Sequence, residues 1–249
     1  MNALPFDVSN GEAVFLAAAL FGAAVIRGLS GFGFSAIFVL FAALVTNPLR
    51  LIPVVFSCEI LMTIFQAKGI AQHIAWRRAI TMLIGAAIAT VPAIYIMARL
   101  DDSSARLVIS LLILGLCALL FSGWQIKRPV NDGGHILAGI ASGTANSAGV
   151  GGLPIAGFMA AQPIPPAVFR ATMIVFLTGI DMMALPVMAV NGLVGPDIWL
   201  GIALALPIIG AGVWLGSRFF QRIPQHRFRQ GIIALMTALA LANIARLVL

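Results

Sequence analysis

The chain has 249 residues, of which 61% are hydrophobic and 9% are Asp, Glu, Lys or Arg, and its mean hydropathy is +1.07. This composition excludes an ordinary soluble protein, in which about 25% of residues are charged, and predicts one compact bundle in a membrane. The net charge of +7 does not indicate a nucleic-acid partner, because the Lys and Arg residues stand at the ends of apolar segments rather than in one dense patch.

The apolar segments form two groups of five, each bounded by Gly, Pro or charged residues. The first group is predicted at residues 12–28, 33–46, 51–67, 79–98 and 107–124. The second group is predicted at residues 135–148, 152–161, 166–190, 197–216 and 230–248. A helix needs about 20 apolar residues to cross the hydrocarbon. Segments 33–46 and 152–161 are shorter, so each either crosses or dips into the membrane and returns.

The distribution of Lys and Arg predicts the orientation. With the N-terminus outside, ten of these residues fall in cytoplasmic loops and four fall outside, while Arg27 sits within the membrane. Because cytoplasmic loops collect positive charge, we expect a periplasmic N-terminus.

A Gly-rich stretch interrupts the apolar sequence near the start of each group, at residues 28–33 and 142–152. An odd number of crossings in each half would place the second half upside down relative to the first, as in many secondary transporters. We therefore predict an all-α integral membrane protein with two inverted repeats of about five helical segments each, at 1–128 and 129–249. The first pair of segments in each repeat is expected to be a broken or re-entrant hairpin.

Two motifs at these breaks, RGLSGFG at 27–33 and GVGGLP at 149–154, resemble the sulfite exporter TauE/SafE family, also called the 4-toluene sulfonate uptake permeases. The resemblance covers most of the chain. It implies a membrane transporter that moves small anions across the bacterial cell inner membrane, often sulfur-containing ones such as sulfite, sulfonates or sulfoacetate.

Backbone breaks at membrane depth are tolerated only where protein or a water-filled cavity surrounds them, so the breaks predict a cavity. If helices restart near Gly33 and Gly152, their free N–H groups and positive dipole ends form a receptor for an oxyanion. The predicted substrate-binding residues are Arg27, Ser30, Gly31, Phe32, Gly33, Ser35, Thr144, Asn146, Ser147, Gly149, Gly151 and Gly152. Packing is the alternative role for the individual Ser residues, since small residues also line tight helix contacts.

Three ionisable residues fall inside the predicted spans. Arg27 could bind the anion directly through its planar guanidinium, or extend to the membrane interface. Glu59 and Asp181 are the acids placed well inside predicted spans, and either could carry a coupling proton. The alternative for each acid is a structural role, hydrogen-bonded or paired with an Arg.

A secondary transporter working by alternating access is the preferred interpretation, because the chain has no Gly-x-x-x-x-Gly-Lys-Ser/Thr motif for nucleotide binding. Its expected partners are a small anionic substrate, membrane lipid and a coupling proton or sodium ion, and a homo-oligomer is compatible with the sequence. A passive anion channel is the nearest alternative. An integral membrane enzyme is disfavoured because the His residues lie at segment edges, away from Glu59 and Asp181. We expect no cofactor and no metal site, with Cys58 and Cys117 as buried apolar residues.

Overall fold

The computed structural model describes residues 6, 8–30, 33–66, 71–122, 125–126, 130–219 and 225–248. Within these ranges the chain is helical and contains no strand, which confirms the predicted class. The first half comprises α1 (Asn10–Ser30), α2 (Phe34–Ala43), α3 (Ile52–Gln66), α4 (Trp76–Met97) and α5 (Asp102–Phe121), with the 3-10 turns η2 (Pro48–Arg50) and η3 (Ala71–His73). The second half comprises α6 (Asp132–Asn146), α7 (Gly152–Ala160), α8 (Pro166–Val190), α9 (Ile198–Phe219) and α10 (Gln225–Val248).

The helices fall into two length classes. Within the described residues, α1, α4, α5, α8 and α9 are each long and apolar enough to cross a membrane. In contrast, α2 has 10 residues and α7 has 9. At 1.5 Å per residue each spans roughly 15 Å, about half of the hydrocarbon thickness. The two short predicted segments are therefore half-length helices.

Several helices begin at a side-chain cap or at a proline. Asp101 caps α5, because its Oδ2 accepts hydrogen bonds from the backbone N–H groups of Ser103 and Ser104 at 3.1 and 3.2 Å. Asn131 caps α6 in the same way. Helix α8 begins at Pro166, a residue suited to the first helical position because its missing N–H would have no partner there.

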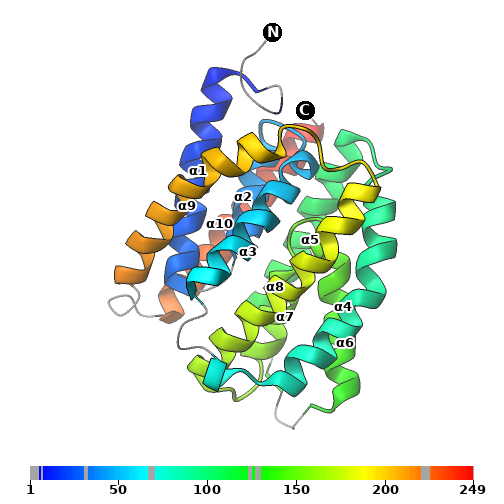
Figure 1. The fold of residues 1–249 in the computed structure, drawn as a ribbon, viewed down its shortest axis with the longest axis vertical. Helices are drawn as coiled ribbons and strands as arrows, with labels where there is room; N and C mark the ends of the chain where they lie inside the picture. Colours follow the sequence, from blue (N-terminus) through cyan, green and yellow to red (C-terminus); the bar gives the residue numbers. More distant parts are fainter. Residues whose placement is uncertain are drawn as a thin grey trace.

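Helices α4 and α6 pack in backbone contact along the right side of Figure 1. A Cβ atom on Gly139 would lie 2.0 Å from the carbonyl oxygen of Met82, and one on Gly143 would lie 2.5 Å from that of Ala86. Both residue numbers rise together along this contact, so the two helices run parallel. Glycine is required here because any side chain would force the helices apart.

Helices α1 and α9 pack in the same manner on the left side of Figure 1. A Cβ on Gly212 would lie 2.8 Å from the carbonyl oxygen of Phe21, and one on Gly216 would lie 2.1 Å from that of Val25. These helices are also parallel. The α1–α9 contact joins the first helix of one half to the fourth helix of the other, and the α6–α4 contact does the same with the halves exchanged, which supports a repeated architecture. The inverted relation and the boundary between residues 128 and 129 stay predictions.

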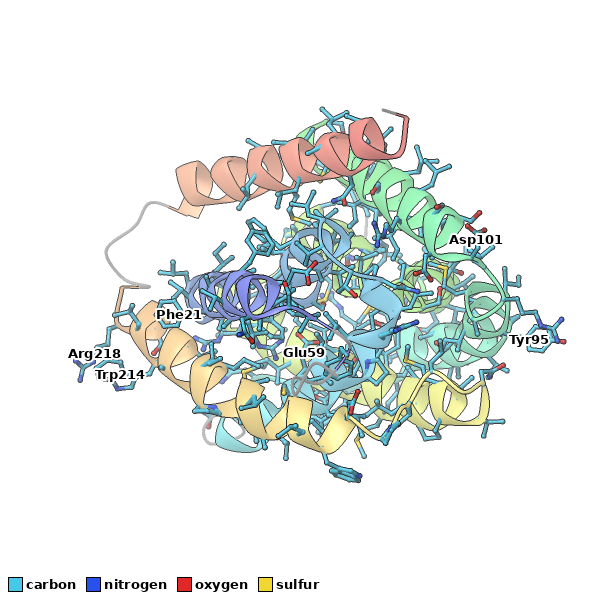
Figure 2. All side chains as sticks on the ribbon, turned by 90° about the horizontal axis from the view of Figure 1, so that it is seen from above. Phe21, Glu59, Tyr95, Asp101, Trp214 and Arg218 are labelled. Carbon is cyan, nitrogen blue, oxygen red and sulfur yellow. The ribbon has the colours of Figure 1, made fainter. Side chains whose placement is uncertain are left out.

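The outward-facing side chains are largely apolar, as expected of a lipid-facing surface. Trp76 and Tyr95 are exposed near opposite ends of α4, about 28 Å apart along the helix, which matches the hydrocarbon thickness. Arg99 lies over the Tyr95 ring at 3.7 Å, and Arg218 lies over the Trp214 ring at 3.9 Å. In Figure 2 Tyr95, Trp214 and Arg218 point away from the bundle. Such aromatic and cationic residues are typical of the membrane–water interfaces.

Candidate functional site

The first break separates α1 from α2. Helix α1 ends at Ser30, and Gly33 precedes α2 with φ of 85°, a left-handed conformation that glycine adopts without steric cost. No side chain of the described residues caps α2. Arg27 lies in the last turn of α1, and Ser35 is buried in the first turn of α2. The break therefore places a buried cation beside an uncapped helix N-terminus.

The second break separates α6 from α7. Helix α6 ends at Asn146, Gly149 has φ of 74°, and α7 begins at Gly152 with no side-chain cap. Ser142 Oγ donates a hydrogen bond to the Gly151 carbonyl oxygen at 2.5 Å, which ties α6 to the start of α7. Ser147 Oγ donates to the Thr144 carbonyl oxygen at 2.7 Å.

The second break packs against the first half of the chain. A Cβ on Gly149 would lie 2.9 Å from Val39 Cγ2 in α2 and 3.1 Å from Ile52 Cγ1 in α3. Gly149 thus combines a left-handed backbone with a close approach of side chains from the other half. The second break therefore lies against α2 and α3 of the first half.

A buried ion pair forms next to the first break. Arg27 Nη1 donates a hydrogen bond to Glu59 Oε1, joining α1 to α3. The side chains of Arg27 and Glu59 are 1% and 4% exposed. Both charges are removed from water and depend on compensation inside the protein, so the pair is a structural constraint as well as a candidate site.

A second acid from the other half adjoins this pair. Asn146 Nδ2 at the end of α6 donates to Asp181 Oδ1 in α8 at 3.4 Å. The Asp181 carboxyl also lies close to the Glu59 carboxyl and to the charge of Arg27. We call Arg27, Glu59, Asn146 and Asp181 the buried charge cluster. In Figure 2, Glu59 lies near the middle of the bundle.

Helices α3 and α8 cross in opposite directions at this cluster. Thr63, one turn after Glu59, lies opposite Thr178, which is nearly one turn before Asp181, and their hydroxyl oxygens are 2.8 Å apart. The residue numbers therefore rise in one helix as they fall in the other. This crossing joins the two halves of the chain through polar contacts.

The structure brings together only some of the residues predicted from the sequence. Arg27, Asn146, Glu59 and Asp181 form the buried charge cluster, and Gly33, Ser35, Ser147, Gly149, Gly151 and Gly152 are buried at the two breaks. Thr144 is exposed, and its hydroxyl donates to the Ile140 carbonyl oxygen within α6. Gly31, Phe32 and the Ser30 side chain lie outside the described residues.

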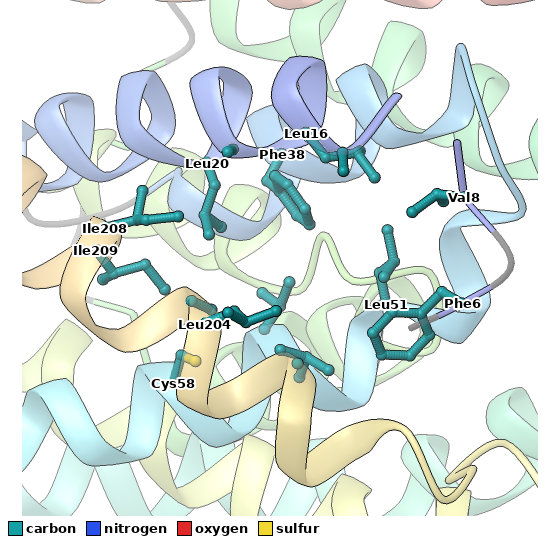
Figure 3. A pocket seen from close by; sticks show the side chains of 16 residues that line it. Phe6, Val8, Leu16, Leu20, Phe38, Leu51, Cys58, Leu204, Ile208 and Ile209 are labelled. Carbon is teal, nitrogen blue, oxygen red and sulfur yellow. The ribbon is translucent and has the colours of Figure 1, made fainter. Parts of the chain in front are cut away.

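An apolar cavity of about 240 Å³ lies between α1, α2, α3 and α9 (Figure 3). Its wall includes Phe6, Leu20, Phe38, Cys58 and Ile209. An anion entering it would lose its hydration and gain no hydrogen-bond donor from these side chains. This cavity is suited to hydrocarbon, and the buried charge cluster is the better candidate for an anion.

The family model described as Sulfite exporter TauE/SafE matches residues 15–243. The chain belongs to the TauE/SafE sulfite exporter family. A search of curated proteins found no match. A search of solved structures also found none. The match confirms the family resemblance seen in the break motifs, and this TauE/SafE protein is a multi-pass membrane protein of a transporter family.

Proposed function

We propose that this protein is a secondary transporter of a small organosulfur anion of the sulfite, sulfonate or sulfoacetate type. The observation that carries the proposal is a buried guanidinium, that of Arg27, beside a break from which a half-length helix starts without a side-chain cap. A second uncapped half-length helix starts at the other break. Guanidinium groups and helix N-termini both favour oxyanions, and membership of the TauE/SafE family supports a small anionic substrate.

In this proposal the anion binds between the two breaks near the bilayer midplane. Arg27 supplies the charge, and the N–H groups at the starts of α2 and α7 supply further donors. The polar crossing of α3 and α8 joins the two halves, so rocking one half against the other exposes the site first to one side of the membrane and then to the other.

The first test is thermal stabilisation of the detergent-purified protein by sulfite, thiosulfate, sulfoacetate, taurine, sulfate, methanesulfonate, lactate and chloride. A ligand that binds only the folded state raises the melting temperature by mass action. We expect a selective rise with an organosulfur anion in the wild type and none in Arg27→Gln. A rise in Arg27→Gln equal to that of the wild type would remove Arg27 from the site, and no rise with any anion would contradict the proposal.

Counterflow in proteoliposomes separates a carrier from a passive anion channel. Vesicles loaded with unlabelled anion should accumulate labelled anion transiently above its external concentration, because a carrier exchanges one for the other. A channel gives no such overshoot. The proposed location is the bacterial inner membrane with the N-terminus in the periplasm, which cysteine labelling at the N-terminus would test.

A further inference from the structure

We propose that Glu59 is a built-in counter-anion of Arg27, and that the Glu59–Asp181 pair holds one proton at rest. When a substrate anion replaces Glu59 on the guanidinium, Glu59 takes a second proton from water. Each monovalent anion that binds is therefore accompanied by one proton. This inference rests on the proposed function, because an anion must reach Arg27.

The charge balance of the cluster is the first argument. Arg27, Glu59 and Asp181 are 2%, 3% and 1% exposed, so all three are removed from water. Two carboxylates against one guanidinium would bury a net negative charge, which is strongly unfavourable in a low-dielectric interior. Asn146, the partner of Asp181, is neutral and supplies no compensating charge. One proton on the carboxyl pair makes the cluster neutral.

The hydrogen-bond geometry is the second argument. Asp181 Oδ2 is buried, and no donor reaches it from the described part of the chain. Its carboxyl nevertheless lies close to that of Glu59, since Thr63, one turn after Glu59, contacts Thr178, nearly one turn before Asp181. Two carboxyl groups can form a hydrogen bond only when one of them carries a proton. A shared proton therefore satisfies the oxygen that is otherwise without a donor.

Among the described residues, the elements around the cluster hold no other acid at the same depth. Of the elements packed against α1, α3 and α8, neither α2 nor α7 contains an ionisable residue, and Cys58 on α3 faces the apolar cavity. The remaining ionisable side chains on these elements lie near helix ends, namely Glu12 on α1, His73 on η3, Arg50 on η2, Arg77, Arg78 and Tyr95 on α4, Asp132 and His135 on α6, Arg170 on α8 and Arg218 on α9.

The displacement step follows from the hydrogen-bonding capacity that Arg27 has left unused. Its Nε is buried and has no hydrogen-bond partner among the described residues, while Nη1 is bound to Glu59. An anion that binds the guanidinium replaces Glu59 as its counter-charge. Glu59 then takes one proton from water, and the net charge of the cluster and its ligand stays at zero for a monovalent anion. Return of Glu59 to Arg27 releases the anion and that proton together.

Infrared difference spectroscopy of the full-length purified protein tests the resting proton. At neutral pH the wild type should show the absorption of one protonated carboxyl group. This absorption should vanish in Glu59→Gln and in Asp181→Asn, because each variant retains one carboxylate to balance Arg27. Asp132→Asn is the matched control, since Asp132 is an exposed acid paired with Arg77 at the surface. The control should keep the absorption.

Methanesulfonate tests the displacement, because it carries one charge at every pH used and has no carboxyl group. It should add a second protonated-carboxyl absorption in the wild type and none in the double variant Glu59→Gln/Asp181→Asn, which has no carboxyl in the cluster to protonate. Its affinity for the wild type should fall about tenfold per pH unit above neutrality, as expected for uptake of one proton on binding. Its affinity for this double variant should not depend on pH.

The outcomes separate this inference from the proposed function. Absence of the resting absorption in the wild type would overturn the inference. Methanesulfonate binding that raises the melting temperature without a new carboxyl absorption, or that instead requires sodium, would also overturn it while leaving the transporter intact. Methanesulfonate that stabilises neither the wild type nor Glu59→Gln would overturn the displacement step. A failure of every anion in the panel to raise the melting temperature would overturn the proposed function.

Discussion

Gly151 and Gly152 are neighbours that should respond differently to the same added methyl group. A Cβ on Gly151 would lie 2.5 Å from Asn146 Oδ1 and 2.7 Å from Asn146 Cβ. A Cβ on Gly152 would meet only Leu177, at 3.3 Å from Cδ2, the flexible end of that side chain. Gly151→Ala should therefore disturb the buried charge cluster, whereas Gly152→Ala should be tolerated.

The size of the effect follows from the contact that is lost. Asn146 would have to move by about 0.5 Å to bring Oδ1 to 3.0 Å from the new methyl group, below which Cβ contacts are essentially not seen. Its hydrogen bond to Asp181 is already long at 3.4 Å, so this movement should break it. Loss of a buried hydrogen bond with one group left unsatisfied costs about 1–3 kcal/mol. In a chain of this size the melting temperature should fall by roughly 2–4 °C per kcal/mol.

The assay is thermal unfolding of the two variants in detergent, with and without methanesulfonate. Gly151→Ala should melt several degrees below the wild type and bind the anion more weakly. Gly152→Ala should stay within about 0.5 kcal/mol of the wild type, as expected of a substitution without a clash. Any gain in helix propensity from alanine applies to both variants and does not explain a difference between them. Equal melting temperatures and equal affinities would show that Asn146 does not position Asp181.

Three further predictions concern the helix contacts and the surface. Thr178→Val removes a hydroxyl contact between α3 and α8 and should lower stability by about 0.5–1.5 kcal/mol, seen as a lower melting temperature. Gly139→Ala should destabilise the α4–α6 contact by about 1–3 kcal/mol, because its Cβ would lie 2.0 Å from a backbone oxygen. Gly210→Ala should not lower stability, because no atom lies within 4 Å of its added Cβ. Equal melting temperatures of the two variants would contradict the packing argument. Hydrogen bonds from Ser104 and other neighbours hold the pKa of Asp101 below its usual value. The ionised Asp101 carboxylate therefore stabilises the folded protein above about pH 4, and this contribution is lost as the pH falls through the lower folded-state pKa. Asp101→Asn should therefore leave the pH dependence of melting between about pH 5 and 8 unchanged. A changed profile in that range would show that a surface acid contributes to this pH dependence along with the buried charge cluster.

Apolarity in the sequence predicted which segments form helices better than where those helices begin and end. The segment predicted at 166–190 coincides with α8, because Pro166 marks its start and the apolar run continues to its end. Helix α4 begins at Trp76 rather than at residue 79, since Trp76, Arg77 and Arg78 are helical residues at the membrane interface. Helix α5 begins at Asp102 rather than at 107, after the Asp101 cap. Helices continue into the interface, where the hydrophobic signal has already ended.

The candidate site was predicted as a set of residues but not as a set of contacts. Arg27, Glu59 and Asp181 stood out because ionisable side chains are costly at membrane depth. The pairing of Glu59 with an Arg was an open alternative, and the structure shows an ion pair of Glu59 on α3 with Arg27 on α1, which no local sequence pattern encodes. Asn146 was expected to donate to the substrate, yet its amide donates to Asp181. That contact depends on how α6 and α8 approach each other in space.

The two halves contribute comparable pairs to the cluster, and they differ in one charge. Near the end of α1, Arg27 binds Glu59 on α3, 32 residues later, and at the end of α6, Asn146 binds Asp181 on α8, 35 residues later. A guanidinium in one half thus stands where the other half has a neutral amide. With two guanidinium groups the cluster would be neutral with both carboxylates ionised, and with two amides it would have no cation for an anion. The single arginine leaves one carboxyl that needs a proton and one cation that can exchange its counter-charge, and the proposed coupling of proton and anion requires both.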